Sequence, residues 1–403
     1  MSGGTPGSRQ IHGIDLLRFL AATFVMFYHL AFCSYANVTS PGHPSAALFK
    51  PLSVFADLAN TGWVGVQIFF VISGFVIAYT ANGRSPASFA SSRVVRLVPG
   101  VWICAALTVP ALLYLGDEPA LAAYKFLRTV SFTPTPPWVA GPYWTLFIEI
   151  AFYSVIFLTL CLNKFDFLEE LISSIGVASM SFWLIALFAN ALHNEQIDNF
   201  VSYIQNHAFF QYILIRHGVF FALGALIWIC KIKGMSPRRF ALGIGFTTGG
   251  LIQIAYEADV TGAFMNASIS GRVAGAIWLV VVGLIVLSVV CNDAISSVVR
   301  GRGVILRLLG LSSYPLYLLH DPLGIAGLRA MTLGGLSPVI GLFIAMAAMI
   351  ALSLFVSALV EPDLQALLRR MLKRDQLVLP PWLSFLRKDT ASFLPAPDQM
   401  PFR

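Results

Sequence analysis

Arg18 and His29 lie eleven residues apart within the first apolar segment of the chain. At about 100° per residue, eleven steps come within roughly 20° of three full turns, so both side chains are expected on one helix face. Their separation along the helix axis is about 16 Å, roughly half the thickness of a hydrocarbon core. A central Arg costs about 2.5–3.5 kcal/mol on membrane-insertion scales, so such residues usually serve a function. The pair predicts part of a reaction centre, with a cation and a potential general base on one face.

Glu149 places an acid several residues inside the fourth apolar segment, with Tyr153 one turn later and Trp144 near the start of the segment. A carboxylate in an apolar environment requires a partner or a proton. Proton transfer, binding of hydroxyl groups and structural pairing therefore all remain open for Glu149. Trp144 also fits an aromatic belt at the membrane interface.

Arg93 and Arg96 are three residues apart and share one side of a helical turn beside the third apolar segment. Two guanidinium groups held in this way suit phosphate, through forked, charge-assisted hydrogen bonds, although ordinary topology anchoring also explains them. Ser73 lies in a glycine-containing second segment that also fits close helix packing. His320 is expected at the end of the ninth segment, where a solvated or capping role is the simpler interpretation.

Apolar segments long enough to position these residues run through most of the chain. Of 403 residues, 57% are hydrophobic and 11% are charged, whereas soluble domains are about 25% charged. Hydropathy predicts ten spans at residues 14–34, 62–81, 97–116, 143–162, 174–192, 209–230, 240–256, 273–291, 304–322 and 338–360. The first lacks a clear cleavage site, so it is expected to be a retained helix. We predict an all-α polytopic membrane protein of about ten transmembrane helices.

The basic residues orient these helices. With ten alternating spans and both termini in the cytoplasm, nineteen lysines and arginines fall on the cytoplasmic side and six on the other. The expected organisation is a flexible cytoplasmic N-terminus at 1–13, a membrane domain at 14–362 and a basic, proline-containing cytoplasmic tail at 363–403. The basic surplus thus reflects topology in a multi-pass inner (plasma) membrane protein, with no clustered nucleic-acid-binding module. The five scattered cysteines argue against a disulfide framework or a zinc site.

The motifs resemble, in consistent order from about residue 11 to 365, the integral-membrane acyltransferase-3 family. This family modifies sugars in bacterial cell envelopes and some secreted products. The matching features are the Arg18–His29 spacing, G-V-x-x-F-F-V-I-S-G-F around Ser73, R-x-x-R, W-T-L-F-I-E-I-A-F-Y, S-S-Y-P-L-Y-L-L-H and the final E-P. Gln67 departs from the pattern, because members often carry an acidic residue or Asn there. Gln67 is polar but uncharged, so it argues against a role at this position that depends on charge.

The resemblance implies transfer of an acyl group, most often acetyl, from cytoplasmic acyl-CoA to a hydroxyl of a saccharide or lipid-linked glycan. Acetyl-CoA would be a co-substrate, and no permanently bound cofactor or metal is expected. The implied donor-binding residues are Arg93, Arg96 and Ser73.

The resemblance and the chemistry of the side chains together suggest roles for the remaining residues. His29 would deprotonate the acceptor hydroxyl or transiently carry the acyl group. Arg18 would orient the donor or stabilise negative charge at the thioester carbonyl. Glu149 would face the acceptor in the reaction centre, and the implied substrate-binding residues are Trp144, Tyr153 and His320.

Two other classes of protein remain open. Ten helices with ionisable groups at membrane depth also fit a proton-coupled transporter or flippase of a lipid-linked sugar, although the two halves show no matching broken helices. A structural or regulatory subunit of an envelope-assembly complex is the third possibility. Labelled acetyl-CoA would separate them, because only an enzyme transfers the label covalently.

Overall fold

The computed structural model describes residues 11–36, 46–192, 195–299 and 301–374, and this part of the chain contains helices and connections but no strand. The first elements are α1 (His12–Phe27), the π-helical η1 (Tyr28–Cys33), α2 (Ser34–Ala36), α3 (Ala46–Phe49), η2 (Lys50–Phe55), α4 (Ala56–Ala59), η3 (Gly62–Val64), α5 (Gly65–Ala81) and α6 (Pro86–Leu115). They are followed by α7 (Pro119–Val130), η4 (Gly141–Tyr143), α8 (Trp144–Cys161), η5 (Phe165–Phe167), α9 (Leu168–Leu192), α10 (Glu195–Asn206), α11 (Ala208–Tyr212) and α12 (Gly218–Lys233). The last are α13 (Pro237–Met265), α14 (Gly271–Val290), α15 (Asn292–Val298), α16 (Gly303–Leu333), α17 (Pro338–Phe355), the π-helical η6 (Val356–Val360) and α18 (Glu361–Arg374).

The all-α prediction is confirmed for these residues, and nine of the ten predicted apolar segments lie almost wholly in helix, whereas the sixth is interrupted. Seven helical runs in the described residues are long and apolar enough to cross a membrane, so the protein is a multi-pass membrane protein with seven candidate spans. They are His12–Ala36, Gly62–Ala81, Pro86–Leu115, Gly141–Cys161, Phe165–Ala189, Gly271–Val290 and Pro338–Leu372. Of the other three predicted segments, α12 has only 16 residues, and α13 and α16 carry charged side chains along their length.

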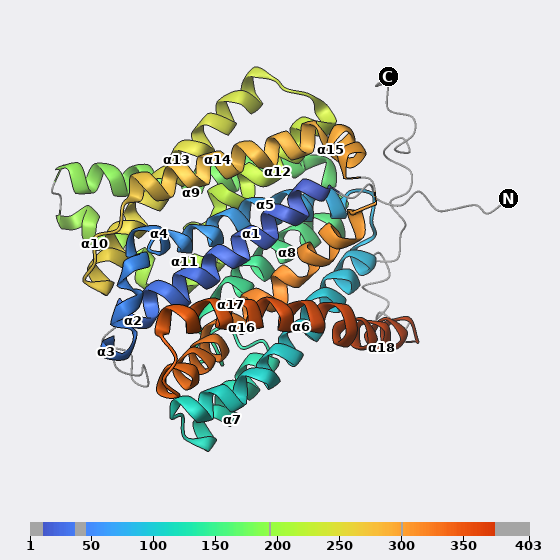
Figure 1. Cartoon of the computed structure of the whole chain (residues 1–403). Coiled ribbons are helices and arrows are strands. Elements are labelled where there is room, and N and C mark those ends of the chain that lie inside the picture. The colour runs from blue at the N-terminus through green and yellow to red at the C-terminus, as the bar shows by residue number, and fades with distance from the viewer. Residues whose placement is uncertain (1–10, 37–45, 193–194, 300, 375–403) are drawn as a thin grey trace.

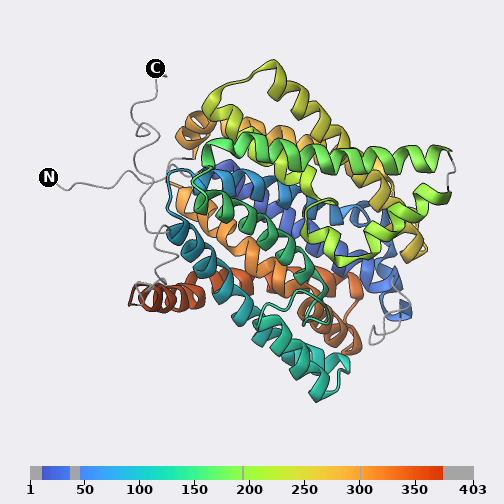
Figure 2. The same ribbon diagram turned by 180° about the vertical axis from the view of Figure 1, so that it is seen from behind.

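The helices form one bundle, and α1 crosses the middle of the face turned toward the viewer in Figure 1, which is the far side in Figure 2. α1 packs against α5, α14 and α16, and α16 also packs against α6 and α17. α5 in turn packs against α8 and α12. Figure 1 shows α15 and α18 at one end of the bundle and α3 and α10 at the other. Helices far apart in the sequence therefore surround the two helices that carry Arg18, His29 and Ser73.

α6 begins eleven residues before the predicted start of the third span at residue 97. Ser85 caps it by accepting a hydrogen bond from the amide of Ser88 at 3.3 Å, and Pro86 occupies the first turn, where a missing N–H is harmless. Arg93 and Arg96 therefore lie inside a long helix, with their side chains directed by its turns.

α16 continues eleven residues beyond residue 322, so the expectation that His320 ends a helix is wrong. The helix runs through Pro315 and Pro322 to Leu333. Prolines are tolerated inside membrane helices because neighbouring helices and local adjustments satisfy the freed backbone groups. His320 consequently lies within the bundle on a continuous helix.

Other differences concern the sixth segment and the tail. The segment predicted at 209–230 is divided into α11 and α12, and Leu214 in the connection has a positive φ of 65°. Arg216 and His217 immediately precede α12. The predicted cytoplasmic tail begins with helix up to Arg374 in α18, whereas 375–403 and most of the predicted flexible N-terminus lie outside the described residues.

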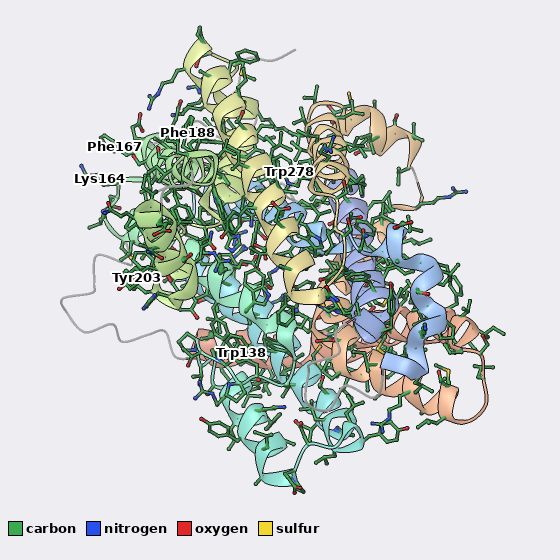
Figure 3. All side chains as sticks on the ribbon, turned by 90° about the vertical axis from the view of Figure 1, so that its left-hand side faces the viewer. Trp138, Lys164, Phe167, Phe188, Tyr203 and Trp278 are labelled. Atoms are coloured by element: carbon green, nitrogen blue, oxygen red, sulfur yellow. The ribbon has the colours of Figure 1, made fainter. Side chains whose placement is uncertain are left out.

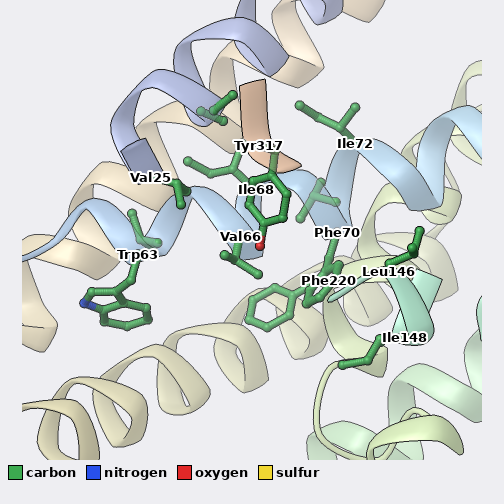
Figure 4. Close-up of a cluster of buried hydrophobic side chains, with 14 of the residues drawn as sticks. Val25, Trp63, Val66, Ile68, Phe70, Ile72, Leu146, Ile148, Phe220 and Tyr317 are labelled. Atoms are coloured by element: carbon green, nitrogen blue, oxygen red, sulfur yellow. The ribbon is translucent and has the colours of Figure 1, made fainter. Parts of the chain in front are cut away.

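Two glycines bring α5 and α12 into backbone contact. A Cβ on Gly74 would meet the Phe221 carbonyl, and one on Gly224 would meet the Val71 carbonyl, both at impossibly short range. Small residues allow such close approach of membrane helices. The close-packing interpretation of the glycines in the second segment is therefore sound for Gly74. Buried side chains from α1, α5, α8, α12 and α16 fill the surrounding core (Figure 4).

Large apolar side chains also cover the outside of the bundle. Phe188 is 61% exposed and Phe167 is 56% exposed, whereas Trp278 on α14 is fully buried (Figure 3). An apolar exterior is what a hydrocarbon environment requires, since lipid tails solvate such side chains. The core and the lipid-facing surface together hold the polar site in place.

Candidate active site

A cavity of 380 Å³ opens between α1, α5, α6, α16 and α18, at the end of the bundle predicted to face the cytoplasm. We call it the inner cavity. Its charged lining residues are Asp15, Arg18, Arg96, Arg307 and Glu361. Arg307 is exposed, whereas Arg18 and Arg96 are partly buried deeper in the helices. Three guanidinium groups along one cavity form a binding surface suited to phosphate oxygens.

Glu149 on α8 accepts two hydrogen bonds from neighbouring side chains. Ser73 on α5 donates to its Oε1 at 3.0 Å, and the Tyr153 hydroxyl donates to the same oxygen at 2.6 Å. The structural pairing considered for Glu149 is therefore present, with partners from two helices. The second carboxylate oxygen accepts no hydrogen bond from these two donors, so the group also has capacity for a further donor.

Arg93 and Arg96 face different surroundings. Arg93 donates to the Thr80 hydroxyl at 3.0 Å, and its guanidinium lies over the rings of Phe89 and Tyr153 at 5.3 and 5.4 Å. Such cation–π contacts hold the group in place. Arg96 instead lines the inner cavity, where Arg93 does not appear. Both arginines also border a small space of 10 Å³ beside Arg18 and Glu149.

A narrow central cavity of 50 Å³ continues from the inner cavity into the bundle. Arg18, Arg96 and Tyr314 line both cavities. Ser73 and Glu149 also border the central cavity. Its far end is formed by Val66 and Tyr317, which lie next to each other in Figure 4.

An outer cavity of 360 Å³ begins at those same two residues, Val66 and Tyr317. His29 and Trp144 are among its walls. The inner, central and outer cavities therefore follow one another through the bundle. Arg18 borders the first two of these cavities, and His29 borders the third.

His29 contacts a second imidazole. Its Nδ1 lies 3.0 Å from the Val25 carbonyl oxygen and 3.0 Å from Nε2 of His320. Nδ1 of His320 in turn lies 3.2 Å from the Leu316 carbonyl oxygen. The ring centroids are 4.8 Å apart, and His320 is fully buried.

These contacts assign the tautomers of both rings. A carbonyl oxygen accepts only, so Nδ1 of His320 carries its proton toward Leu316, and Nε2 of the neutral ring is an acceptor. Nδ1 of His29 then carries its own proton, shared between the Val25 carbonyl and Nε2 of His320. If Nδ1 of either ring were unprotonated, its lone pair would point at the lone pairs of a carbonyl oxygen, and the two would repel each other. Nε2 of His29 is consequently the nitrogen with an available lone pair.

The local helix geometry changes at His29. The π-helical turn η1 begins at Tyr28 and ends at Cys33, directly after α1. π-bulges occur frequently at functional sites, because the extra residue in the turn redirects side chains. The prediction that Arg18 and His29 share one helix face assumed 100° per residue, and this value applies to α1 but not to the π-helical turn that contains His29.

The predicted site residues fall into three groups. Arg18, Ser73, Arg96 and Glu149 surround the central cavity, where the structure brings them together. His29 and Trp144 border the outer cavity. Arg93 and Tyr153 lie beside Glu149, and His320 lies behind His29 and lines none of these three cavities.

Several polar lining residues were given no role by the sequence analysis. These are Arg307, Tyr314, Tyr317, Glu361, Arg216, His217 and Glu257. Tyr314 and Tyr317 belong to the S-S-Y-P-L-Y-L-L-H motif already noted. Arg216 and His217 fall within the predicted sixth span, where an ionisable pair is itself a signal of function. Glu257 gave a weaker signal, because it directly follows the predicted seventh span.

Known proteins match this chain over its membrane region. A family model described as an acyltransferase domain matches residues 11–358. The exopolysaccharide production protein ExoZ of Rhizobium meliloti (strain 1021) is 35% identical over 106 residues, which are 23% of this chain and 33% of ExoZ. Nodulation protein 10 of Rhizobium leguminosarum bv. viciae is 32% identical over 165 residues, 35% of this chain and 42% of the relative.

A regulator of hypoxia-inducible factor 1 from Caenorhabditis elegans is 30% identical over 184 residues, 40% of this chain and 36% of that protein. The matches thus span 33%, 36% and 42% of the curated relatives' own lengths. No solved structure matches the chain. The family match covers nearly all of the described helices that form the three cavities, and the chain belongs to the acyltransferase-3 family of membrane proteins.

Proposed function

We propose that the protein transfers an acetyl group from acetyl-CoA to a hydroxyl of a cell-envelope or exported saccharide, as a multi-pass protein of the inner (plasma) membrane. The observation that carries this proposal is the succession of three cavities from the arginines of the inner cavity to His29. Membership of the acyltransferase-3 family supports the reaction type. The similarity to ExoZ, an exopolysaccharide production protein, supports a saccharide acceptor.

The inner cavity binds the donor in this proposal. Arg307 at its exposed mouth and Arg96 within it contact the phosphates of CoA, because guanidinium groups bind phosphate oxygens in a bidentate manner. Arg18 borders the inner and central cavities but not the outer one. Of the two roles considered for Arg18, its position favours orienting the donor over stabilising charge beside His29.

The acyl-pantetheine arm follows the cavities toward His29. The central cavity is only 50 Å³, so side chains there, Tyr317 among them, move aside when the arm enters. Ser73 and Glu149 border this passage and offer polar contacts to the amide groups of the arm. Arg93 and Tyr153 hold Glu149 and its surroundings in position through the contacts described above.

His29 performs the chemistry at Nε2. As general base it removes the proton from the acceptor hydroxyl, whose oxygen attacks the thioester carbonyl. The carbon–sulfur bond then breaks, and the CoA thiolate leaves with the proton that the imidazole returns. Acyl transfer through His29 itself would use the same lone pair. Tyr317, at the junction of the central and outer cavities, donates a hydrogen bond to the thioester oxygen as negative charge develops.

The test uses purified protein in lipid nanodiscs with radiolabelled acetyl-CoA and oligosaccharides released from the envelope of the native host. Label bound covalently to the saccharide supports the proposal. A transporter or flippase would instead move a lipid-linked sugar across liposome membranes without modifying it. Intact acetyl-CoA and unlabelled saccharide after prolonged incubation with well-folded protein would exclude the proposed reaction.

A further inference from the structure

The outer cavity has the dimensions of a ligand site. Its volume of 360 Å³ lies within the range of about 300–1,000 Å³ typical of small-molecule sites. Its walls come from α1, η1, η3, α5, η4, α8, α13 and α16, together with the connection before α12. Val25, Trp63, Val66 and Tyr317, four of the lining residues, gather on one side of the view in Figure 4. His29 reaches this cavity from α1's continuation in η1.

Three buried side chains at this cavity, His217, Gln67 and Trp63, have polar atoms without a partner among the described residues, and the Trp63 atom is the indole Nε1 donor. His217 is 2% exposed, and neither of its ring nitrogens makes a hydrogen bond. Gln67 is 3% exposed, and its Oε1 has no donor. An unpaired buried polar group costs about 1–3 kcal/mol. A ligand that carries both donors and acceptors would satisfy these atoms.

The same wall contains a chain of polar contacts. Gln67 donates from Nε2 to Gln253 Oε1 at 3.5 Å, and Gln253 donates from Nε2 to Glu257 Oε2 at 3.3 Å. This direction of donation leaves Oε1 of Gln67 as the unpaired atom. Gln253 is fully buried and does not line the cavity, so it orients the two residues that do.

The charges of the cavity offset each other. Glu257 lies 4.0 Å from the Arg216 guanidinium, and both groups line the cavity. His217 is held between aromatic rings, 5.2 Å from Phe70 and 5.5 Å from Trp144 by ring centroids. Aromatic walls with a few fixed polar groups are typical of small-molecule sites, and the balanced charges of this cavity favour an uncharged molecule.

We infer that the outer cavity binds a neutral sugar unit of the acceptor, with His217, Gln67 and Glu257 contacting its hydroxyl groups. One hydroxyl of that sugar then faces Nε2 of His29. This inference rests on the proposed function and deepens it, because it names the part of the acceptor that is recognised. A sugar hydroxyl can donate a hydrogen bond and also accept one. It can therefore pair with the imidazole of His217, the amide oxygen of Gln67 and the carboxylate of Glu257.

The experiment separates released envelope oligosaccharides into neutral and acidic pools by anion exchange. Acetyl transfer is measured for each pool with wild-type protein, His217→Phe and Glu257→Gln. The wild type is expected to acetylate the neutral pool preferentially. His217→Phe retains a ring between Phe70 and Trp144 but loses its nitrogens, so the KM for the neutral pool should rise about tenfold while the KM for acetyl-CoA stays unchanged.

Glu257→Gln leaves Arg216 without its carboxylate, so the preference for the neutral pool over the acidic pool should fall about tenfold. His207→Phe, an exposed histidine outside the three cavities, is the matched control and should behave as wild type. Thermal unfolding of each variant identifies loss of folding. Preference of the wild type for the acidic pool, or an unchanged acceptor KM in well-folded His217→Phe, would overturn the inference. Absence of acetyl transfer to either pool by the wild type would instead count against the proposed function.

Discussion

Nδ1 of His29 lies 3.0 Å from Nε2 of His320, although the two residues are 291 positions apart in the chain. The contact joins η1 to the middle of α16, and it leaves the available lone pair on Nε2 of His29, a residue that lines the outer cavity. In the proposed reaction His320 is a positioning residue, because it acts through the tautomer of His29.

Replacing His29 by alanine is expected to abolish acetyl transfer, because Nε2 of His29 is the base in the proposed reaction. Insertion and folding should persist, since His29 is only partly buried and contributes little to the packed core. Labelled acetyl transfer and thermal unfolding measure the two effects. Near-normal turnover of His29→Ala would remove this residue from the mechanism.

Substitutions of His320 test whether this residue positions His29 or only fills space in the core. His320→Leu removes the acceptor for the His29 proton and should lower kcat by about tenfold to a hundredfold, as general-base catalysis contributes a larger factor still. The KM for acetyl-CoA should stay unchanged, because His320 does not line the inner cavity. His320→Gln, whose amide oxygen can accept the same proton, should restore part of kcat. Equal activity of the two variants would assign His320 a packing role alone.

Arg96 and Arg93 should differ in their effect on the donor. Arg96→Gln is expected to raise the KM for acetyl-CoA about tenfold, because a charge-assisted contact to phosphate is worth about 1.5–3 kcal/mol. The KM for S-acetylpantetheine, which lacks the nucleotide phosphates, should change far less. Arg93→Gln is the matched comparison, since Arg93 is held by Thr80 and two aromatic rings. An equal change of KM for both donors in Arg96→Gln would contradict phosphate binding by this residue.

The paired hydrogen bonds on Glu149 predict a stability effect. Glu149→Leu leaves the hydroxyls of Ser73 and Tyr153 without an acceptor, at a cost of about 1–3 kcal/mol for each buried group. Tyr153→Phe removes only one donor and should cost about 1 kcal/mol. Thermal unfolding in detergent measures both variants. A Glu149→Leu variant no less stable than Tyr153→Phe would show that the carboxylate does not hold these helices together.

Gly74 and Gly283 form a matched pair for the packing of the bundle. Gly74→Ala places a methyl group against the Phe221 backbone and should destabilise the fold by about 1–3 kcal/mol or more. Gly283→Ala on α14 meets nothing within 4 Å, so it should be neutral or slightly stabilising. Unfolding midpoints compare the two. A neutral Gly74→Ala would contradict the backbone contact between α5 and α12.

The sequence predicted the helices better than their ends. All ten apolar segments are mostly helical, because long apolar runs have few alternatives in a membrane. The ends of α6 and α16 were misplaced, since Pro86 begins a helix and Pro322 does not end one. Tertiary contacts that compensate for a proline are not visible in hydropathy.

The candidate site was predictable in its residue types and not in its partners. Because ionisable side chains within a membrane carry a free-energy cost, Arg18, His29 and Glu149 could each be recognised as candidates from the sequence. The contact of His29 with His320, the different surroundings of Arg93 and Arg96, and the polar wall containing His217 depend on helices far apart in the chain. A single sequence contains no measure of those distances. The π-helical turn at His29 also lies beyond a periodicity argument that assumes one fixed step per residue.

The narrow central cavity has a consequence for the membrane itself. The central cavity of 50 Å³ has room for only a few water molecules, so in the proposed reaction donor and acceptor meet within the bundle with little water between them. Arg18 and Arg96 at the narrowest place add an electrostatic barrier against hydronium and other cations, as arginines do in water-selective pores. In the proposed reaction, this barrier limits proton leakage through the protein while a proton changes partners at His29.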